Sequence, residues 1–454
     1  MSGEENAPPI ESRSDLVYVM AAGGKPRSEW RIGTEHEKHV YRRGPLGPVP
    51  YEGPDGIHAL LSGIAHRTGW HPFYDHDNPI GLRNHHAVGG ISLEPGGQFE
   101  LSGSPQRTIH EAAAELDSHL EDCHAIGRQL NIHFLGLGVT PLWSVDAIPA
   151  MPKSRYAIMT PYMGKVGTLG TSMMYRSATV QANLDFSDEA DMVRKMRVSL
   201  ALQPVVTALF ANSPFVDGAP SGYLSFRSQI WLETDAARTG MLPFVFEDGF
   251  DFDRYAEYAL DVPMYFVIRK GEYINVAGES FRAFLEGRLP QLPGVRPTTK
   301  DWENHLSTLF PEVRLKQFLE MRGADMGDRD HVLALSALWA GLLYDADALA
   351  AAADLVSDWT AAEREALRRE VPRTALATAF RDGTVADLAR LVVDLARGGL
   401  ARRGQVRGGH DETVYLAPLD TTLELGKTPA ERWLDLYHGA WGGDLTRIFE
   451  AAEI

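Results

Sequence analysis

Two glutamates flank a Pro-Gly-Gly turn in the stretch Ile91–Gly103, a spacing that could bind a cation. Glu94 precedes the turn, and Glu100 follows it between the apolar Phe99 and Leu101. Such alternation places a polar residue on one face of a strand and its neighbours on the other. A buried carboxylate is costly unless a positive group meets it. The stretch therefore predicts a site for a metal ion or a cationic substrate, with a solvent-facing edge strand as the alternative.

A second pair of acids, Glu35 and Glu37, lies in the stretch Arg31–His39, which is polar on both faces if it is a strand. The two glutamates would then share one face. An exposed edge strand, whose charges deter aggregation, has the same pattern. The acids around the Pro-Gly-Gly turn favour a common cation site.

The stretch Thr179–Phe186 alternates polar and apolar residues, which predicts a half-buried strand. Its polar face carries Gln181, Asn183 and Asp185. Amides both donate and accept hydrogen bonds, so this face suits an amino acid, a phosphate or a metal. An ordinary strand facing water is the alternative.

Glu320 and Arg322 have strand spacing within Arg314–Asp325. A planar guanidinium matches phosphate oxygens, so the acid could hold a metal and the arginine a phosphate. A surface ion pair, which would contribute little, is the alternative.

Arg227 lies on a predicted strand between Phe226 and Trp231 and is a candidate clamp for a substrate carboxylate, although packing explains it equally well. The glycine-rich stretch Tyr162–Gly170 fits neither the P-loop nor the dinucleotide fingerprint, and it predicts a lid or a plain loop.

The 16 histidines show no paired spacing on one helix that would indicate zinc. His36 and His39, like His85 and His86, are expected to be ordinary surface or cleft residues. A site of carboxylates, an amide and water instead favours Mg²⁺.

The composition excludes several classes of protein. A formal net charge of −17 over 454 residues argues against nucleic acid or an anionic membrane as a partner. No run of apolar residues is long enough to predict a membrane span. The single cysteine, Cys123, cannot form a disulfide within the chain, and its apolar helical stripe predicts a buried, inert thiol. The acidic start lacks the apolar segment of a signal peptide, so we expect a cytoplasmic protein.

Hydrophobic periodicity predicts the elements that must position these residues. Helices are expected at Gly56–Thr68, Ile109–Leu130 and Ala190–Ala211. Strands are expected at Arg31–Val40, Ile132–Val139, Thr179–Phe186, Tyr223–Leu232 and Pro263–Arg269. Their irregular order and polar faces favour an α+β fold. Residues 1–14 are expected to be a disordered leader, and 15–454 a single catalytic domain whose part from about 330 to 454 is mostly helical.

Several long motifs resemble those of a known family. They include WRIGTEHEKHVY, ISLEPGGQFELSGSP, MPKSRYAIMTPYM, TVQANLDFS, DWENHLSTLFPEVRLK and FLEMRGAD. From about Trp30 to Trp441 the chain resembles the plant-type glutamate–cysteine ligases, a group that also occurs in many bacteria. The resemblance implies a six-stranded antiparallel sheet forming a cleft, as in the glutamine synthetase and guanidino-kinase catalytic domains. It also implies ATP-dependent joining of the L-glutamate γ-carboxylate to the amine of L-cysteine through γ-glutamyl phosphate, the first step of glutathione biosynthesis.

The resemblance also implies roles for individual residues. The implied Mg²⁺ ligands are Glu35, Glu37, Glu94, Glu100, Gln181 and Glu320. The other implied contacts are Arg322 and Lys316 on ATP, and Arg227, Trp231 and Tyr265 on the amino acids. Arg322 and Glu100 would act directly in catalysis.

Plant members carry cysteines that form regulatory disulfides and a plastid-targeting extension. With Cys123 alone, this chain is expected to be a bacterial member, as a monomer or a homodimer. Three alternatives stay open: a ligase for another amine acceptor, a hydrolase that uses acids such as Glu35 and Glu100 as a general acid and base, and a non-catalytic amino-acid or nucleotide sensor.

Overall fold

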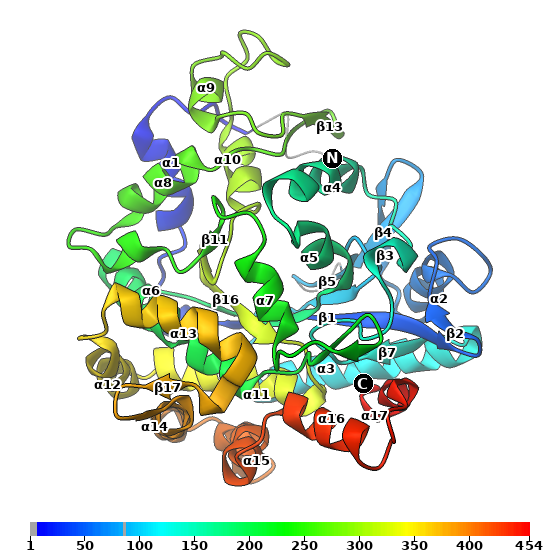
Figure 1. The fold of residues 1–454 in the computed structure, drawn as a ribbon. Helices are drawn as coiled ribbons and strands as arrows, with labels where there is room; N and C mark the ends of the chain where they lie inside the picture. The colour runs from blue at the N-terminus through cyan, green and yellow to red at the C-terminus, as the bar shows by residue number, and fades with distance from the viewer. Residues whose placement is uncertain (1–6, 85–87) are drawn as a thin grey trace.

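A large antiparallel sheet organises the protein, which we describe from a computed structural model covering residues 7–84 and 88–454 (Figure 1). Eight strands follow the order β15-β16-β8-β1-β6-β5-β4-β3, and β2 and β7 also pair with β1. The strands are β1 (Ile32–Arg43), β2 (Leu46–Pro48), β3 (His71–Asp75), β4 (Asn78–Arg83), β5 (Gly90–Leu93), β6 (Phe99–Ser102), β7 (His133–Leu135), β8 (Thr179–Leu184), β15 (Val313–Leu315) and β16 (Leu319–Asp325). The predicted α+β class is confirmed. The sheet has ten strands where the family resemblance implied six, because short strands such as β2 and β7 pair with the long β1 beside β8 and β6.

Helices surround the sheet and make up most of the C-terminal part. The longer ones are α1 (Arg13–Ala21), α2 (Ile57–Thr68), α3 (Ile109–Leu130), α4 (Ser154–Val166), α6 (Glu189–Leu209), α8 (Phe252–Asp261), α10 (Thr299–Leu306), α11 (Arg329–Leu343), α12 (Ala346–Val356), α13 (Ala361–Thr374), α14 (Val385–Arg403), α15 (Ala417–Leu425) and α16 (Pro429–His438). Short ones are α5 (Gly170–Arg176), α7 (Phe226–Leu232), α9 (Phe281–Leu285), α17 (Ile448–Ala451) and the 3-10 turns η3 (Pro243–Phe246) and η5 (Glu412–Leu416).

Small two-stranded sheets complete the structure. They pair β9 (Phe215–Val216) with β10 (Ala219–Pro220), β11 (Thr239–Gly240) with β14 (Phe310–Pro311), β12 (Phe266–Arg269) with β13 (Glu272–Asn275), β17 (Ala379–Phe380) with β18 (Gly383–Thr384), and β19 (Val406–Arg407) with β20 (His410–Asp411). Among the described residues no single helix is long and apolar enough to cross a membrane, and the one pair that passes together, α11 with α12, is bent by 89°.

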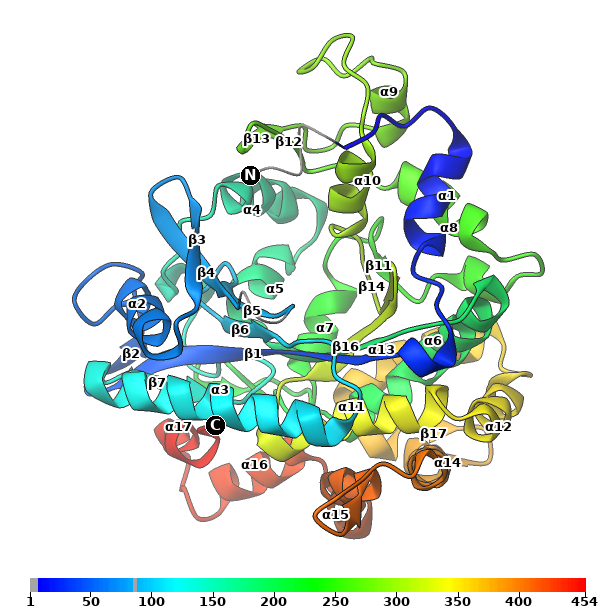
Figure 2. The same cartoon turned by 180° about the vertical axis from the view of Figure 1, so that it is seen from behind.

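One face of β1 packs on helices and the other does not. Thr34 Oγ1 lies 2.7 Å from Ser336 Oγ of α11, and the His36 ring contacts His119 of α3, with ring centroids 5.5 Å apart. Viewed from behind, α3 and α11 run along this face, while α5 and α7 lie on the other side (Figure 2). Because side chains alternate along a strand, the acids of β1 point away from α3 and α11.

The predicted helices match α2, α3 and α6 closely, and the predicted burial of Cys123 in α3 is confirmed. Burial raises the pKa of its thiol to about 12, which keeps it protonated and inert.

Two predicted elements are wrong. The predicted strand Tyr223–Leu232 contains α7, because Ser225 caps a helix there by accepting a hydrogen bond from the Ser228 N–H. The predicted loop Tyr162–Gly170 is mostly the last turn of α4, in which the buried Met163 packs against Tyr265.

The predicted leader is also too long. Ile10 is buried and its N–H donates to the Pro297 carbonyl at 3.0 Å, and α1 begins at Arg13. Residues 1–6 of the leader, and the histidines 85 and 86, lie outside the described residues.

Candidate active site

The strand register gathers the predicted site residues on one face of the sheet. Glu37 of β1 pairs directly with Glu100 of β6, and Glu35 with Gln181 of β8. Direct partners in antiparallel strands point to the same face. Both β1 and β6 lie inside the sheet, so the edge-strand alternative is wrong for each of them.

The Pro-Gly-Gly turn brings Glu94 beside this group. The Glu94 N–H donates to the Gln98 carbonyl at 3.0 Å, and the Gly97 N–H donates to the Glu94 carbonyl at 2.9 Å. Gly97 has a φ of 80°, which disfavours other residues, and a Cβ at Gly96 would lie 2.1 Å from the Tyr175 carbonyl oxygen. The glycines therefore permit a tight turn against α5.

The acids on this face repel one another. Burial, together with Glu320 and Glu100, raises the pKa of Glu35 to about 7. Burial, with Glu94 and Glu100, raises the pKa of Glu37 well above its usual range, and burial with Glu94 also raises the pKa of Glu100. Such shifts mark carboxylates whose charged forms a bound cation would stabilise.

These carboxylates keep oxygens free for a ligand. Asn183 donates to Glu35 Oε1 at 2.6 Å, and the Thr179 N–H donates to Glu37 Oε2 at 3.0 Å. Ser92 and Ser102 donate to the two oxygens of Glu100 at 2.7 and 3.2 Å. Each acid thus has at most two hydrogen bonds, although a carboxylate can accept about four.

These side chains are better suited to Mg²⁺ that is bound together with substrate phosphates than to a metal ion held by protein ligands alone. In the described part of the chain no three His, Cys, Asp or Glu side chains are arranged to hold a metal ion by themselves. Mg²⁺ is usually held by one or two carboxylates, with water and substrate phosphates completing its octahedron. Free carboxylate oxygens on this face of the sheet are therefore compatible with Mg²⁺ that arrives with a polyphosphate.

Replacing Glu35 with Gln is expected to stabilise the ligand-free protein in a pH-dependent way. A carboxyl whose folded-state pKa is raised gives its stabilisation below the unfolded pKa, and this is lost as pH rises toward the folded pKa, here about 7. Melting temperatures of Glu35→Gln and wild type should therefore be close at pH 4.5 and should differ, with the variant higher, at pH 8. A difference that is the same at both pH values would show that Glu35 does not titrate abnormally.

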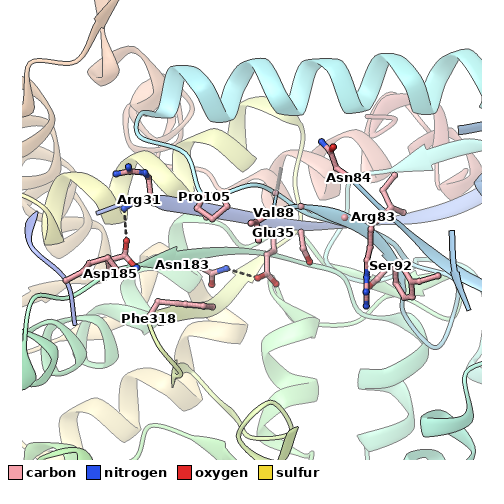
Figure 3. Close-up of a pocket in the computed structure, with 18 residues that line it drawn as sticks. Arg31, Glu35, Arg83, Asn84, Val88, Ser92, Pro105, Asn183, Asp185 and Phe318 are labelled. Atoms are coloured by element: carbon pink, nitrogen blue, oxygen red, sulfur yellow. Dashed lines mark hydrogen bonds and ion pairs between the residues drawn. The ribbon is translucent and has the colours of Figure 1, made fainter. Parts of the chain in front are cut away.

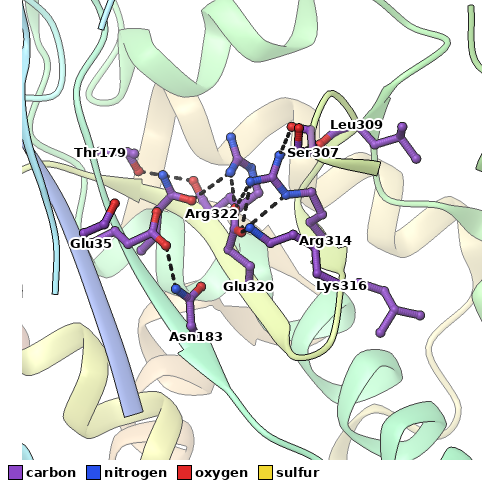
Figure 4. Close-up of polar contacts among 12 residues, drawn as sticks. Glu35, Thr179, Asn183, Ser307, Leu309, Arg314, Lys316, Glu320 and Arg322 are labelled. Carbon is purple, nitrogen blue, oxygen red and sulfur yellow. Dashed lines mark hydrogen bonds and ion pairs between the residues drawn. The ribbon is translucent and has the colours of Figure 1, made fainter. Parts of the chain in front are cut away.

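Glu320 lies in a different environment, surrounded by three cations (Figure 4). Arg314 donates to both of its oxygens, at 2.7 and 2.9 Å, and Lys316 Nζ lies 2.9 Å from Oε2. Arg322 bridges Glu320 Oε1 and Gln181 Oε1, the latter at 2.7 Å. Burial alone would raise the pKa of Glu320, but the three cations hold it well below its usual range.

A cavity of about 560 Å³, the Glu35 cavity, opens on one side of the acids (Figure 3). Aromatic and cationic side chains line it, among them Phe73, Phe318, Lys25, Arg31 and Arg83, together with Glu35 and Asn183. Arg83 lies over the Phe73 ring, 4.8 Å from its centroid. A cavity of this size accommodates a ligand as large as a nucleotide.

A smaller cavity of about 80 Å³, the Glu37 cavity, lies on the other side. Its lining includes Glu37, Glu94, Arg155, Arg227, Trp231 and Arg322. Three buried donors in this lining, Arg155 Nε, Arg227 Nε and Trp231 Nε1, have no hydrogen-bond partner among the described residues. Unpaired buried donors are costly, so they indicate a bound acceptor such as a carboxylate.

Four further residues bear on the Glu37 cavity: two that the sequence analysis named and two that it did not. Trp231 lines the Glu37 cavity, whereas Tyr265 does not line it and contacts Met163 and the Tyr162 ring. Sequence reasoning missed Arg155 and the buried Lys153, which come from the start of α4. Burial lowers the pKa of Lys153 to about 8, against the raising effect of Glu94. Their only signal was the motif MPKSRYAIMTPYM.

One face of the sheet thus carries acids, cations and two cavities. Comparison with known proteins shows that the protein is a ligase of the glutamate–cysteine type. The model of the glutamate–cysteine ligase family 2 matches residues 31–451, and the chain belongs to this family.

Similar curated proteins are plant enzymes. The chloroplastic glutamate–cysteine ligase of Nicotiana tabacum is 54% identical over 439 residues, which cover 97% of this chain and 82% of that protein. The chloroplastic glutamate–cysteine ligase B of Oryza sativa subsp. japonica is 53% identical and is covered to 86%. Among solved structures, the glutamate–cysteine ligase of Francisella tularensis in complex with AMP aligns with a TM-score of 0.55 at 13% identity, over 93% of this chain and 87% of that one, and shares the fold.

Proposed function

We propose that this chain joins the γ-carboxylate of L-glutamate to the amine of L-cysteine, with cleavage of ATP to ADP and phosphate. The observation that carries the proposal is the row of paired residues Glu37–Glu100 and Glu35–Gln181 between two cavities. One cavity suits a nucleotide, the other a small anionic amino acid, and the acids stand where the two substrates would meet.

The Glu35 cavity is proposed to hold ATP. Its aromatic side chains Phe73 and Phe318 can contact a base, and its cations can contact phosphates. The triphosphate would extend toward Arg322 and Lys316, both bound to Glu320. The AMP complex of the Francisella tularensis enzyme supports a nucleotide site in this fold.

The Glu37 cavity is proposed to hold glutamate. Arg155 and Arg227 offer unpaired donors to its carboxylates, and a guanidinium fork matches a carboxylate. This cavity is small, so we expect it to widen when the amino acids enter.

The reaction needs an activated carboxylate, because a carboxylate is a poor electrophile. A γ-carboxylate oxygen attacks the γ-phosphorus of ATP and ADP leaves, giving γ-glutamyl phosphate. The neutral cysteine amine then attacks the acyl carbon, and phosphate leaves with the former carboxylate oxygen. The Glu35, Glu37, Glu94, Glu100 and Gln181 side chains would hold Mg²⁺, which when bound neutralises the phosphate charge. Arg322 would orient the transferred phosphoryl group, so catalysis is mainly positioning and electrostatic stabilisation.

Glu320 is also a proposed Mg²⁺ ligand, and this role requires a rearrangement. Its oxygens are engaged by three cations. Phosphates that drew Lys316 and Arg322 away would free one carboxylate oxygen for the metal.

The test is product formation by the purified chain. With ATP, Mg²⁺, glutamate and cysteine, we expect one γ-glutamylcysteine for each ADP released, detected by mass spectrometry and a coupled ADP assay. Replacing cysteine with 2-aminobutyrate should preserve turnover and show that the thiol is not required. ADP release without a dipeptide, or dipeptide formation without ATP, would overturn the proposal.

Trp231→Phe is expected to raise the KM for glutamate about tenfold with little change in kcat. The variant keeps an aromatic ring, although a smaller one, and removes the Nε1–H, which has no described partner and would donate to a substrate carboxylate. Steady-state kinetics with glutamate as the varied substrate measures this, and Trp70→Phe is the matched control because Trp70 lines neither cavity. An unchanged KM for glutamate would remove Trp231 from the amino-acid site.

Four finer points are proposals as well. We infer kinship with the glutamine synthetase and guanidino-kinase catalytic domains from the antiparallel sheet with acids on one face. A cytoplasmic location and a bacterial origin are proposed from the single cysteine, which cannot form a disulfide within the chain. We expect a monomer or a homodimer, which size-exclusion chromatography with light scattering will distinguish.

A further inference from the structure

A third cavity, of about 530 Å³, lies between α6, η3, α12 and α13 and shares no lining residue with the Glu35 or Glu37 cavity. We call it the α6 cavity. Its apolar walls include Val193, Val198, Phe246, Val356 and Trp359, and its charged lining residues are Arg194, Arg197 and Arg364. None of the described lining residues is acidic, although the chain carries a net charge of −17.

Arg364 is the centre of this cation group. It is 8% exposed, its guanidinium carbon lies 3.5 Å from the centroid of the Phe246 ring, and its Nη1 donates to the Trp359 carbonyl. Its Nε and Nη2 have no hydrogen-bond or ion-pair partner among the described residues. Arg364 lines the α6 cavity, and a largely buried charge is normally paired, so an anion bound in this cavity would complete the contacts of its guanidinium.

The other two arginines are not neutralised either. Arg197 donates only to backbone carbonyls, those of Val245 at 2.8 Å and Glu247 at 2.7 Å. Arg194 is exposed and has no hydrogen bond or ion pair with any described residue.

Nearby acids are occupied elsewhere. Asp358 and Glu363 flank the α6 cavity in sequence, and both pair with Arg381, at 3.0 and 2.8 Å. The charge of Glu363 acts on Arg364 through space, but no hydrogen bond or ion pair joins either acid to Arg364 among the described residues.

We propose that the α6 cavity is a second binding site, for a small organic anion with a carboxylate or phosphate head group and an aromatic or branched aliphatic body. The head group would be held by Arg364 and Arg194, whose guanidinium N–H groups match planar oxygen acceptors. The body would lie against Phe246, Trp359 and the valines. Apolar walls with a few convergent polar groups are the usual composition of a small-molecule site.

The test uses 8-anilinonaphthalene-1-sulfonate, a fluorescent aryl sulfonate, with the full-length chain. We expect saturable fluorescence that persists when Mg²⁺ and ATP fill the active site. Arg364→Gln should weaken this binding about tenfold, as loss of a charge-assisted hydrogen bond does, and Arg194→Gln should weaken it several-fold. Arg369→Gln, which removes an exposed charge from the same helix as Arg364, is the matched control and should bind like the wild type.

Two further arms keep the outcome decisive. Arg194→Gln carries the test if Arg364→Gln does not fold, because Arg194 has no described partner to lose. Competition with 3-phenylpropionate and with phenyl phosphate identifies the preferred head group, and displacement by either supports the site. Displacement of the probe by ATP, equal binding by all three variants, or displacement by neither competitor would overturn the proposal.

Discussion

Glu100→Gln is expected to abolish turnover, by at least about a hundredfold, while the protein stays folded and melts no lower than the wild type. Glu100 pairs directly with Glu37, and burial together with Glu94 raises its pKa. A neutral side chain of the same shape removes repulsion from the ligand-free protein but leaves Mg²⁺ and the phosphates one negative ligand short. Activity and stability should therefore move in opposite directions, as they do where a site is arranged for a ligand.

ADP release and differential scanning calorimetry measure the two effects. Glu424→Gln is the matched control, because Glu424 is exposed on α15 and has no described ion pair. It should retain wild-type activity. Near-normal turnover of Glu100→Gln would exclude Glu100 from the metal site, and a large drop in its melting temperature would show that its role is structural.

Glu320→Gln is expected to destabilise the protein by about 3–5 kcal/mol, because it leaves buried cations without their counter-charge. Glu320 is fully buried and bonded to Arg314, Lys316 and Arg322, which hold its pKa well below the usual range. The expected change in stability is opposite in sign to that of Glu100→Gln, although both substitutions remove one acid from the same sheet face. Urea unfolding monitored by circular dichroism gives the free energy of unfolding.

A second substitution tests the cause. Lys316→Gln in the Glu320→Gln background removes one of the unbalanced cations and should recover part of the lost stability, whereas Lys316→Gln alone should be mildly destabilising. Additive effects of the two substitutions would contradict the charge-balance explanation.

The strand-borne part of the site could be predicted from the sequence because alternation fixes which side chains share a face. Glu35 and Glu37 lie on β1, and Gln181 on β8, as predicted, although β1 ends three residues later and β8 two residues earlier than expected. Which strands are neighbours could not be read from alternation, so the pairing of Glu37 with Glu100 needed the structure.

Other parts depend on contacts that no local pattern reports. Arg227 was expected on a strand, but the Ser225 cap begins a helix there. From this helix Arg227 donates to the Arg322 carbonyl of β16 at 3.0 Å. Lys153 and Arg155 reach the site from the start of α4, about 50 residues from the Glu100 hairpin. The sequence placed Glu320 with the metal ligands, yet the β15–β16 hairpin sets Arg314 opposite it and turns this acid into the centre of a cation cluster.

The most direct test of the proposed reaction is oxygen transfer from glutamate to phosphate. When L-glutamate labelled with ¹⁸O in its γ-carboxylate is turned over with ATP, Mg²⁺ and cysteine, the proposal requires one ¹⁸O in each inorganic phosphate released, measured by ³¹P NMR or mass spectrometry. This transfer follows from attack of the γ-carboxylate on ATP and expulsion of phosphate by the amine. Unlabelled phosphate, formed together with the dipeptide, would contradict the γ-glutamyl phosphate route and the roles assigned to Arg322 and the acids around it.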